Sequence, residues 1–488
     1  VRLFRPVSSS DTLPAPEGGQ PQAGLTVQSH RRGADGRVAR RSRWQWGLFA
    51  GVKGEDLRDA TEVQPIARLA NVHAGFGLNK LHRVGLDFAD PAAGWGAMYM
   101  PPDAVQAMIE RLRNDPEFHR RAYDTVTYTR PLIDAWCDAT GAKREAVLEQ
   151  LAADAGDLLR RHVEGDGAMD FHVHYWHGSL RMSRAAAWLD SLLAAPDLMG
   201  EQRQRCKAIL ALYAAVVWDD DVVPLFEGHG LNLGTANMPV QYQGVRDLYA
   251  LMLARHPMMR GRAEGVWQRA QATVHETINE HGAHMGCTHY IGAANGPLLS
   301  ILQQLKMSGL ADPFKEEPRL RQYAEFEMNF LTPPDPRVGR RARPAIGDAE
   351  PVETTEFLGQ LATAYADLDP GLSARLMGAW RQSGRPHSDF HGATILKIDE
   401  RLPDRDPALA SAHFEGWHSV LRFGWGTPNE TAAWFVNGGW YRDHASNDLG
   451  EVVIYALGAP LSLDFGSMYS PISPGGFVHS VALPESAI

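Results

Sequence analysis

The chain has 488 residues, of which 44% are hydrophobic and 22% charged, and its formal net charge is −10. This length and composition are those of a globular protein with two or three domains. The acidic balance argues against a general nucleic-acid-binding protein, although it leaves room for a local basic cleft that binds a polyanion. The longest apolar run, residues 209–218, is shorter than the ~18 residues of a membrane-spanning helix, so we expect no membrane partner.

The cysteines and the first residue say little about the compartment. Cys137, Cys206 and Cys287 are odd in number and far apart, so they form neither a disulfide framework nor a paired metal motif. The chain starts at Val1 without a signal peptide, so its start does not decide whether the protein is secreted.

Residues 1–45 are rich in Pro, Gly, Ser and Arg and show little periodicity, and we interpret them as a loosely held N-terminal arm. The helical pattern extends from about residue 100 to 385. Apolar residues recur there at i, i+3, i+4 and i+7 in segments without intervening strands: 101–115, 143–163, 182–195, 202–218, 245–256, 263–281, 296–309 and 354–368. This pattern predicts helices packed on helices, and helix pairs that close into a toroid fit it equally well.

The period changes after about residue 387. Residues 419–425, 431–440, 450–458 and 460–466 are short β-branched or aromatic runs separated by Gly, Pro and Asn, which predicts an antiparallel β region. About 100 residues are few for an independent sandwich. Either these strands pair with strands elsewhere, or the chain stops before the domain ends.

Polar residues that could catalyse a reaction or bind a metal flank one of these strands. His444, Asp448 and Gly450 precede it, whereas Gly458, Leu461, Asp464 and Gly466 follow, and His479-Ser480 comes later. This arrangement resembles the β domain of the heparinase II/III-like polysaccharide lyases, which include alginate lyases. The resemblance implies an α+β chain in which an (α/α) toroid, residues 46–386, is followed by an antiparallel β-sandwich domain, residues 387–488, incomplete at its C-terminus.

The resemblance also implies a function: β-elimination in a uronic-acid polymer, which leaves a C4=C5 double bond. The partner would be an anionic polysaccharide such as hyaluronan, chondroitin, heparan sulfate or alginate, and the enzyme would be secreted or periplasmic. Two rival functions stay open. A glycoside hydrolase on a similar toroid needs two opposed carboxylates, and Asp219–Asp221 are adjacent instead. A non-catalytic carbohydrate-binding relative is favoured by Ser446 and Met238, where the family has histidines.

β-Elimination requires a group that neutralises the substrate carboxylate, a base for the C5 proton and an acid for the leaving oxygen. By resemblance, Asn237 supplies the first, 53 residues before Tyr290; a helix cap is an equally good interpretation of this Asn. Tyr290, in a Gly-flanked turn beside His289, is the expected acid and base, and His444 its partner.

Further residues are candidates for the substrate groove, and His289 beside Tyr290 is one of them. The segment 171–181 gathers His174, Tyr175, Trp176 and Arg181, whose rings and charge suit sugars and their carboxylates. Packing between helices explains the same cluster almost as well. His229 lies between two glycines, and it either reaches the cleft or is solvated there. The arginine-rich run 337–343 is interpreted as a solvated loop, with a mobile loop that touches a polyanion as the less favoured alternative.

One structural divalent metal is a further expectation from the resemblance, held by Asp464, His479 and Asp448, without an organic cofactor. The family's second histidine is replaced by Ser446 here. This replacement puts zinc in doubt and favours a harder ion with oxygen ligands.

Overall fold

The structure is a computed structural model. It describes residues 102–464 apart from 126–129, 139–140, 165–175, 196–197, 199, 218–236, 255–258, 354–355, 388–396 and 446–447, together with three N-terminal strands. These strands, β1 (Phe4–Arg5), β2 (Thr26–Arg32) and β3 (Val38–Gln45), form an antiparallel sheet in the order β1-β2-β3 within the segment expected as an arm. The rest of that segment lies outside the described residues.

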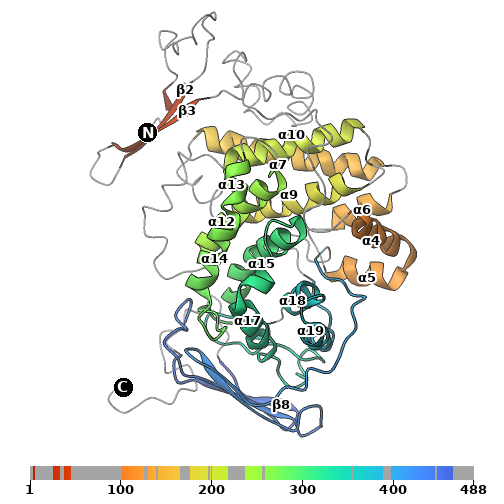
Figure 1. Cartoon of the computed structure of the whole chain (residues 1–488), viewed down its shortest axis with the longest axis vertical. Coiled ribbons are helices and arrows are strands. Elements are labelled where there is room, and N and C mark those ends of the chain that lie inside the picture. Colours follow the sequence, from red (N-terminus) through yellow and green to blue (C-terminus); the bar gives the residue numbers. More distant parts are fainter. Residues whose placement is uncertain are drawn as a thin grey trace, which may run out of the picture. The chain divides into compact units, whose positions relative to one another are not determined.

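The described chain continues as helices and ends in strands, as the change of sequence period predicts (Figure 1). The helices are α4 (Pro102–Asn114), α5 (Pro116–Thr125), α6 (Arg130–Cys137), α7 (Ala142–Glu164), α9 (Trp176–Ala194), α10 (Gly200–Val217), α12 (Asn237–Met252), α13 (Arg260–Glu264), α14 (Val266–Thr277), α15 (Tyr290–Ser308), α16 (Pro313–Glu316), α17 (Pro318–Met328), α18 (Phe357–Tyr365) and α19 (Pro370–Gln382). None of these described helices is long and apolar enough to cross a membrane.

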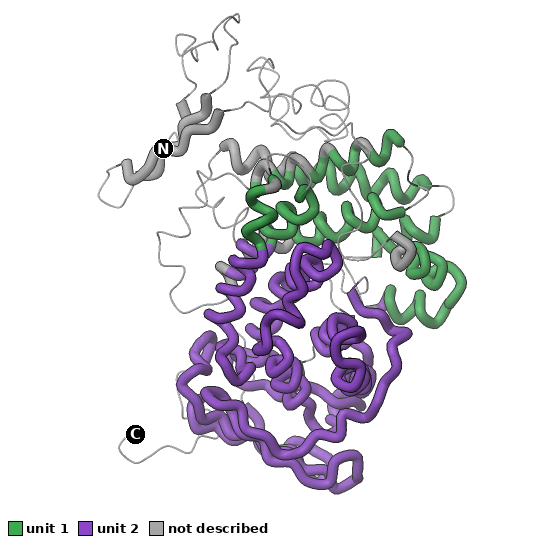
Figure 2. Tube along the Cα trace, viewed as in Figure 1, with its two compact units in different colours: residues 1–123, 128–230, 245–266 green, residues 124–127, 231–244, 267–488 purple. Residues whose placement is uncertain are grey.

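The chain divides into two compact units (Figure 2). Unit 1 comprises residues 1–123, 128–230 and 245–266, and its helix α7 packs against α6 and α10. Unit 2 comprises residues 124–127, 231–244 and 267–488, with helices α15 to α19 and the C-terminal strands. The closure of the helices into a toroid and the domain boundary at residue 386 stay predictions.

Unit 2 contains one five-stranded antiparallel sheet in the described residues, with the strand order β4-β5-β6-β7-β8. This confirms the antiparallel β region, while a second sheet that would complete a sandwich stays a prediction. The strands are β4 (Ala412–Phe414), β5 (His418–Phe423), β6 (Thr431–Val436), β7 (Val452–Ala456) and β8 (Ala459–Ser462).

The inner face of this sheet packs on helix α17 through aromatic rings. Phe326 of α17 makes edge contacts with Phe414 and Trp417, at centroid distances of 5.4 and 6.0 Å. The indole of the buried Trp434 donates to the carbonyl of Asn329 at 3.1 Å. Large aromatic rings therefore join the sheet to the helices, and the indole N–H of Trp434 keeps a hydrogen-bond partner there.

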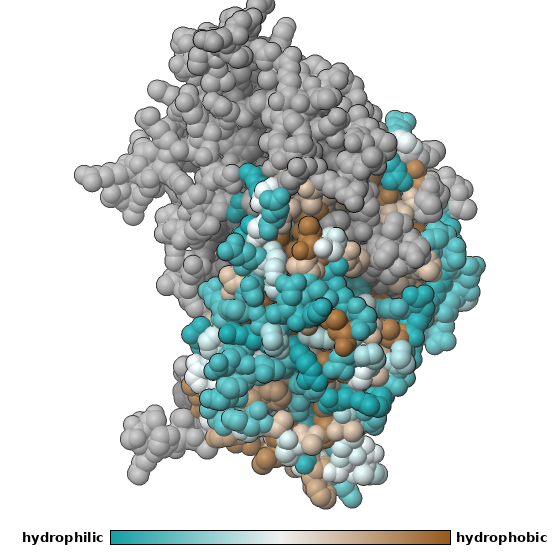
Figure 3. All heavy atoms as spheres, in the orientation of Figure 1, coloured by the Kyte–Doolittle hydropathy of each residue, from teal (hydrophilic) through white to brown (hydrophobic). Residues whose placement is uncertain are grey.

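The outer face of the sheet is apolar but exposed. Leu421 and Phe423 of β5 are 66% and 75% exposed, and Leu461 of β8 is 58% exposed. Apolar spheres gather over these strands at the lower edge of Figure 3. Strands β5 and β6 thus carry apolar residues on both faces, a pattern typical of sheets covered on both sides.

The arginine-rich run is a solvated loop only in its first half, residues 337–340, and the interpretation is wrong for Arg341 and Arg343. Arg341 is buried and forms a two-pronged ion pair with the buried Glu430, at 2.7 and 2.8 Å. Arg343 is buried against Glu327 of α17. Arg337 pairs with Asp335 at 2.7 Å. The arginines anchor the loop because burial of a guanidinium requires a carboxylate partner.

Candidate active site

Two loops of unit 2 are joined by main-chain hydrogen bonds. Residues 285–287 precede α15, and residues 442–443 follow β6. Arg442 and Asp443 each donate an N–H to the carbonyl of Met285 at 3.0 Å, and Cys287 donates to the carbonyl of Asp443 at 3.0 Å. These bonds hold the start of α15 beside the loop that carries His444.

Tyr290 and His444, two of the three predicted catalytic residues, stack face to face. Their ring centroids are 3.4 Å apart and their planes differ by 3°. The two rings are therefore in direct contact, and a positive charge that forms on the imidazole when it accepts a proton is attracted to the face of the phenol ring.

Tyr290 occupies a different local structure from the one expected. It is the first residue of α15, and it is buried, whereas the sequence suggested a turn between two helices. The helix continues through Pro297, so the Gly-Pro pair does not mark its start. The N-terminus of a helix favours a negative charge, which is the charge of a phenolate.

His444 is held by a carboxylate that the sequence analysis missed. Its Nδ1 lies 3.1 Å from Oδ2 of Asp348, and its Nε2 lies 4.0 Å from Oδ1 of Asp443. Burial lowers the pKa of His444, although the bond to Asp348 opposes this, and the charge of His289 lowers the pKa further. His444 is thereby kept largely neutral near pH 7 and able to accept a proton.

His289 completes a row of three rings. Its ring meets that of Tyr290 edge to face at 5.3 Å, and its Nδ1 lies 2.9 Å from Oε1 of Glu353. Burial lowers the pKa of His289, but the hydrogen bond and charge of Glu353, with Glu350 and Asp348, outweigh it and leave the pKa raised. The two histidines beside Tyr290 are thus shifted in opposite directions, as in sites that separate acid and base roles.

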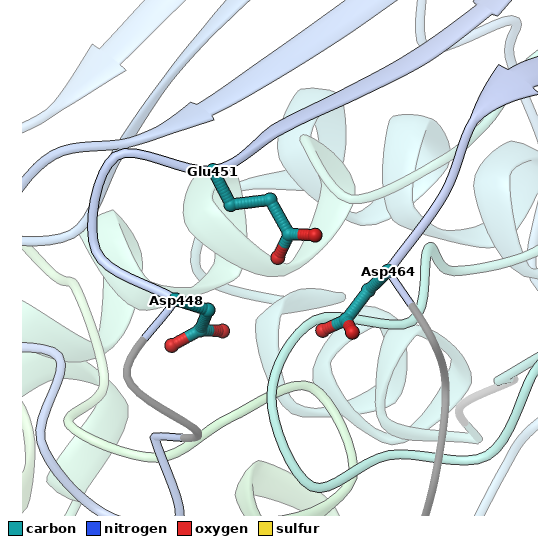
Figure 4. Close-up of side chains that lie close together, drawn as sticks. All are labelled: Asp448, Glu451 and Asp464. Atoms are coloured by element: carbon teal, nitrogen blue, oxygen red, sulfur yellow. The ribbon is translucent and has the colours of Figure 1, made fainter. Parts of the chain in front are cut away.

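Three carboxylates gather next to this row. Asp448, Glu451 and Asp464 are buried and offer oxygen atoms within 4.8 Å of one another, pointing toward a common centre in Figure 4. The hydroxyl of Tyr441 donates to Oδ2 of Asp448 at 2.8 Å. Buried like charges repel at this range unless a cation or protons compensate them. An all-oxygen donor set fits calcium, magnesium or manganese better than zinc.

Two of the three metal ligands predicted from the sequence lie close together, and metal binding itself stays a prediction. Asp448 and Asp464 belong to the carboxylate cluster, whereas His479 and Ser446 lie outside the described residues. Glu451 was missed, although an acid directly after Gly450 at the entrance of a strand was a usable signal.

The remaining predicted residues are only partly described. Asn237 is the first residue of α12, and Trp176 and Arg181 lie in α9, but the structure does not describe their side chains. His174, Tyr175 and His229 lie outside the described residues. Their predicted roles are therefore untested.

Helix α12 contacts α15 beyond its first turn. The side-chain amide of Gln241 donates to the carbonyl of Ala293 at 3.1 Å. Further along the helix, a Cβ at Gly244 would lie 2.7 Å from that of Pro297. These contacts fix α12 at Gln241 and Gly244, and the role of Asn237 stays a prediction.

Comparisons with known proteins found similarity in solved structures alone: no family model matches the chain, and no curated protein matches it. A crystal structure of heparinase III matches with 14% identity and a TM-score of 0.49, covering 85% of this chain and 67% of that one. A heparinase III gene product matches with 13% identity and a TM-score of 0.46, covering 85% and 66%. Heparan sulfate lyase HepC from Pedobacter heparinus matches with 12% identity and a TM-score of 0.42, covering 83% and 64%.

The chain thus spans about two thirds of the length of these solved proteins.

Proposed function

We propose that the protein is a polysaccharide lyase that cleaves a uronate-containing polyanion by β-elimination. The observation that carries this proposal is the stack of Tyr290 on His444, with His289 at the edge of the same tyrosine. A phenol between two imidazoles of opposite pKa shift has the groups that removal of the C5 proton and protonation of O4 require.

Each residue receives a role from its surroundings. His289, whose pKa is raised, supplies a positive charge next to Tyr290 and so favours its phenolate. His444, whose pKa is lowered, would accept the proton of the Tyr290 hydroxyl. The phenolate would then remove the C5 proton and deliver it to the leaving O4. Asn237, the first residue of α12, would donate its amide to the substrate carboxylate and so stabilise the developing enolate.

The proposed substrate is a glycosaminoglycan or alginate. The similar solved proteins are named for heparin and heparan sulfate, so heparan sulfate is the first member of the panel, followed by hyaluronan, chondroitin and alginate. Polymers of this kind are found outside cells, and we propose a secreted or periplasmic location on that basis.

The test is a spectrophotometric assay on that panel. A lyase raises the ultraviolet absorbance through the new C4=C5 bond, a hydrolase yields reducing ends without absorbance, and a binding protein yields neither. Tyr290→Phe should abolish the absorbance and leave the circular dichroism unchanged. A matched control is Tyr365→Phe, which removes a buried hydroxyl of α18 that has no hydrogen-bond partner among the described residues, and which should keep full activity. Full activity of Tyr290→Phe would refute the assignment of the acid.

We propose further that the carboxylate cluster holds one oxygen-preferring divalent cation. Asp448, Glu451 and Asp464 would bind it, and the cation would neutralise their mutual repulsion. Chelation should lower the melting temperature, and added calcium or manganese should restore it. Glu451→Gln should weaken that restoration, while the exposed Glu415→Gln should not. A melting temperature indifferent to chelator and to all added metals would contradict the cation.

A further inference from the structure

The segment 346–348 is fixed on several sides. The N–H of Ile346 donates to the hydroxyl of Thr288 at 3.0 Å, and that hydroxyl donates back to the carbonyl of Ile346 at 3.2 Å. The N–H of Gly347 donates to Oδ2 of Asp464 at 2.6 Å. The thiol of Cys287 donates to the carbonyl of Asp348 at 3.3 Å. Asp348 therefore extends from a rigid support and not from a free loop.

Asp348 contacts His444 twice. Its N–H donates to the carbonyl of His444 at 3.1 Å, and its Oδ2 lies 3.1 Å from Nδ1 of the ring. The first contact fixes the backbone of His444, and the second fixes the rotation of the imidazole. Both contacts come from Asp348, so this one residue orients the imidazole of His444 relative to Tyr290.

The chemistry of the second contact selects a tautomer. An ionised carboxylate only accepts hydrogen bonds, so the neutral imidazole must carry its proton on Nδ1 and donate it to Asp348. Nε2 then bears the lone pair. It lies 4.0 Å from the carboxylate of Asp443, too far for a hydrogen bond. The same logic orients histidines that act as bases in other enzymes.

We propose that Asp348 is a positioning residue for His444: it holds the imidazole in the Nδ1–H tautomer and in the plane that stacks on Tyr290. The structural part of this proposal stands by itself, whereas its catalytic consequence rests on the proposed lyase function.

The tautomer is measured by nitrogen NMR of protein labelled with 15N-histidine, and the signal of His444 is the one that disappears in His444→Gln. The wild type should show a protonated Nδ1 and an unprotonated Nε2 at neutral pH. Asp348→Asn should lose this preference, because an amide can donate to the ring as well as accept from it. Asp348→Glu, which keeps the carboxylate, should retain part of it.

The kinetic consequence is a fall in kcat with little change in KM. Loss of the carboxylate that orients a catalytic histidine costs up to about 10⁴-fold in other enzymes, so Asp348→Asn should lower kcat by roughly 10²-fold or more. Asp348→Glu should recover part of this loss. The exposed Asp367→Asn, in the same unit, should change neither the spectrum nor kcat.

Two results would overturn the proposal. One is an Nε2–H tautomer in the wild type, which needs no folded variant. The other is an Asp348→Asn protein that keeps both the wild-type tautomer and the wild-type kcat. If no polymer is cleaved by the wild type, the lyase function fails, and the NMR result alone decides the role of Asp348.

Discussion

His444 has a backbone φ of 56°, in the left-handed region that residues with a Cβ seldom adopt. Such strain persists only where the surroundings enforce it, and it gathers at functional sites. Here the neighbouring Asp443 accepts from Cys287, and the carbonyl of His444 accepts from Asp348. The strained conformation turns the imidazole toward Tyr290, which is an independent reason to look for chemistry at this position.

The sequence predicted this pair but not the residues that hold it. His444 and Tyr290 could be identified from the sequence because the family resemblance marks both. Asp448 and Asp464 could be identified because they belong to the same motif. Asp348 and Glu353 could not be found, since they come from a proline-containing loop without periodicity or motif. Their relation to the histidines arises only from the tertiary fold.

Gly347 offers a residue-scale prediction. Its φ is 77°, and a Cβ there would collide with the hydroxyl of Tyr441 and lie 2.7 Å from Cβ of Cys287. Gly347→Ala should therefore lower the free energy of unfolding by about 2–4 kcal/mol, from backbone strain and overpacking together. Gly339 has a φ of 67° and open space around it, so Gly339→Ala should cost only about 1 kcal/mol. Urea denaturation measures both, and equal losses would rule out the steric explanation.

At the scale of elements, the strands were predicted better than the helix ends. The four runs between residues 419 and 466 correspond to β5, β6, β7 and β8, because period-2 apolar patterns separated by Gly and Pro are a strong signal. Helix α15 begins six residues before the predicted segment, since tertiary contacts override a Gly-Pro pair. The burial of the second half of the arginine-rich run was not predicted, because charge alone does not reveal a buried carboxylate partner in the turn before a distant strand.

The pair of Arg341 and Glu430 gives a prediction for these elements. It joins the loop after α17 to the turn before β6, and both side chains are buried. Glu430→Ala should lower the free energy of unfolding by about 3–5 kcal/mol, because it leaves a buried guanidinium without its carboxylate. Arg401→Ala breaks the exposed pair with Asp399 and should cost at most about 1 kcal/mol. Comparable losses in urea denaturation would mean that burial is not what makes the first pair important.

At the scale of the whole molecule, the order of helices followed by an antiparallel sheet was predictable, because the hydrophobic period changes once along the chain. The division into two units was not predicted. Unit 2 combines helices α15 to α19 with the sheet, and the aromatic packing of Phe326 against Phe414 that joins them has no local sequence signal.

Stability of the fold should depend on pH through buried histidines. Burial lowers the pKa of His418 to about 3, with smaller effects of Arg422 and His413, and burial with the charge of Arg343 lowers that of His284 to about 3. An unfolded histidine titrates near 6.5. The unfolded chain therefore binds more protons as the pH falls below about 6.5, and each histidine then removes about 1.4 kcal/mol of stability per pH unit until the folded state also titrates.

His418→Phe isolates one of these contributions. The ring of His418 lies among Phe326, Phe330 and Phe414, and in the part of the chain that the structure describes neither of its nitrogens has a hydrogen-bond partner. Between pH 6 and pH 4, the free energy of unfolding of the variant should fall less steeply than that of the wild type. The two slopes, measured by urea denaturation, should differ by about 1.4 kcal/mol per pH unit. The exposed His413→Asn should keep the wild-type slope. Parallel slopes for His418→Phe and wild type would show that His418 is not neutral in the folded state.

The open side of the five-stranded sheet has a practical consequence for handling the protein. Leu421 and Phe423 expose enough hydrocarbon to adsorb to a phenyl matrix, and ammonium sulfate strengthens such adsorption. The protein should elute late from hydrophobic-interaction chromatography, and replacing both residues by lysine should advance its elution clearly. Leu310→Lys, which changes a solitary half-exposed leucine after α15, should advance it far less. Retention on the column would then show which surface of unit 2 adsorbs to the matrix.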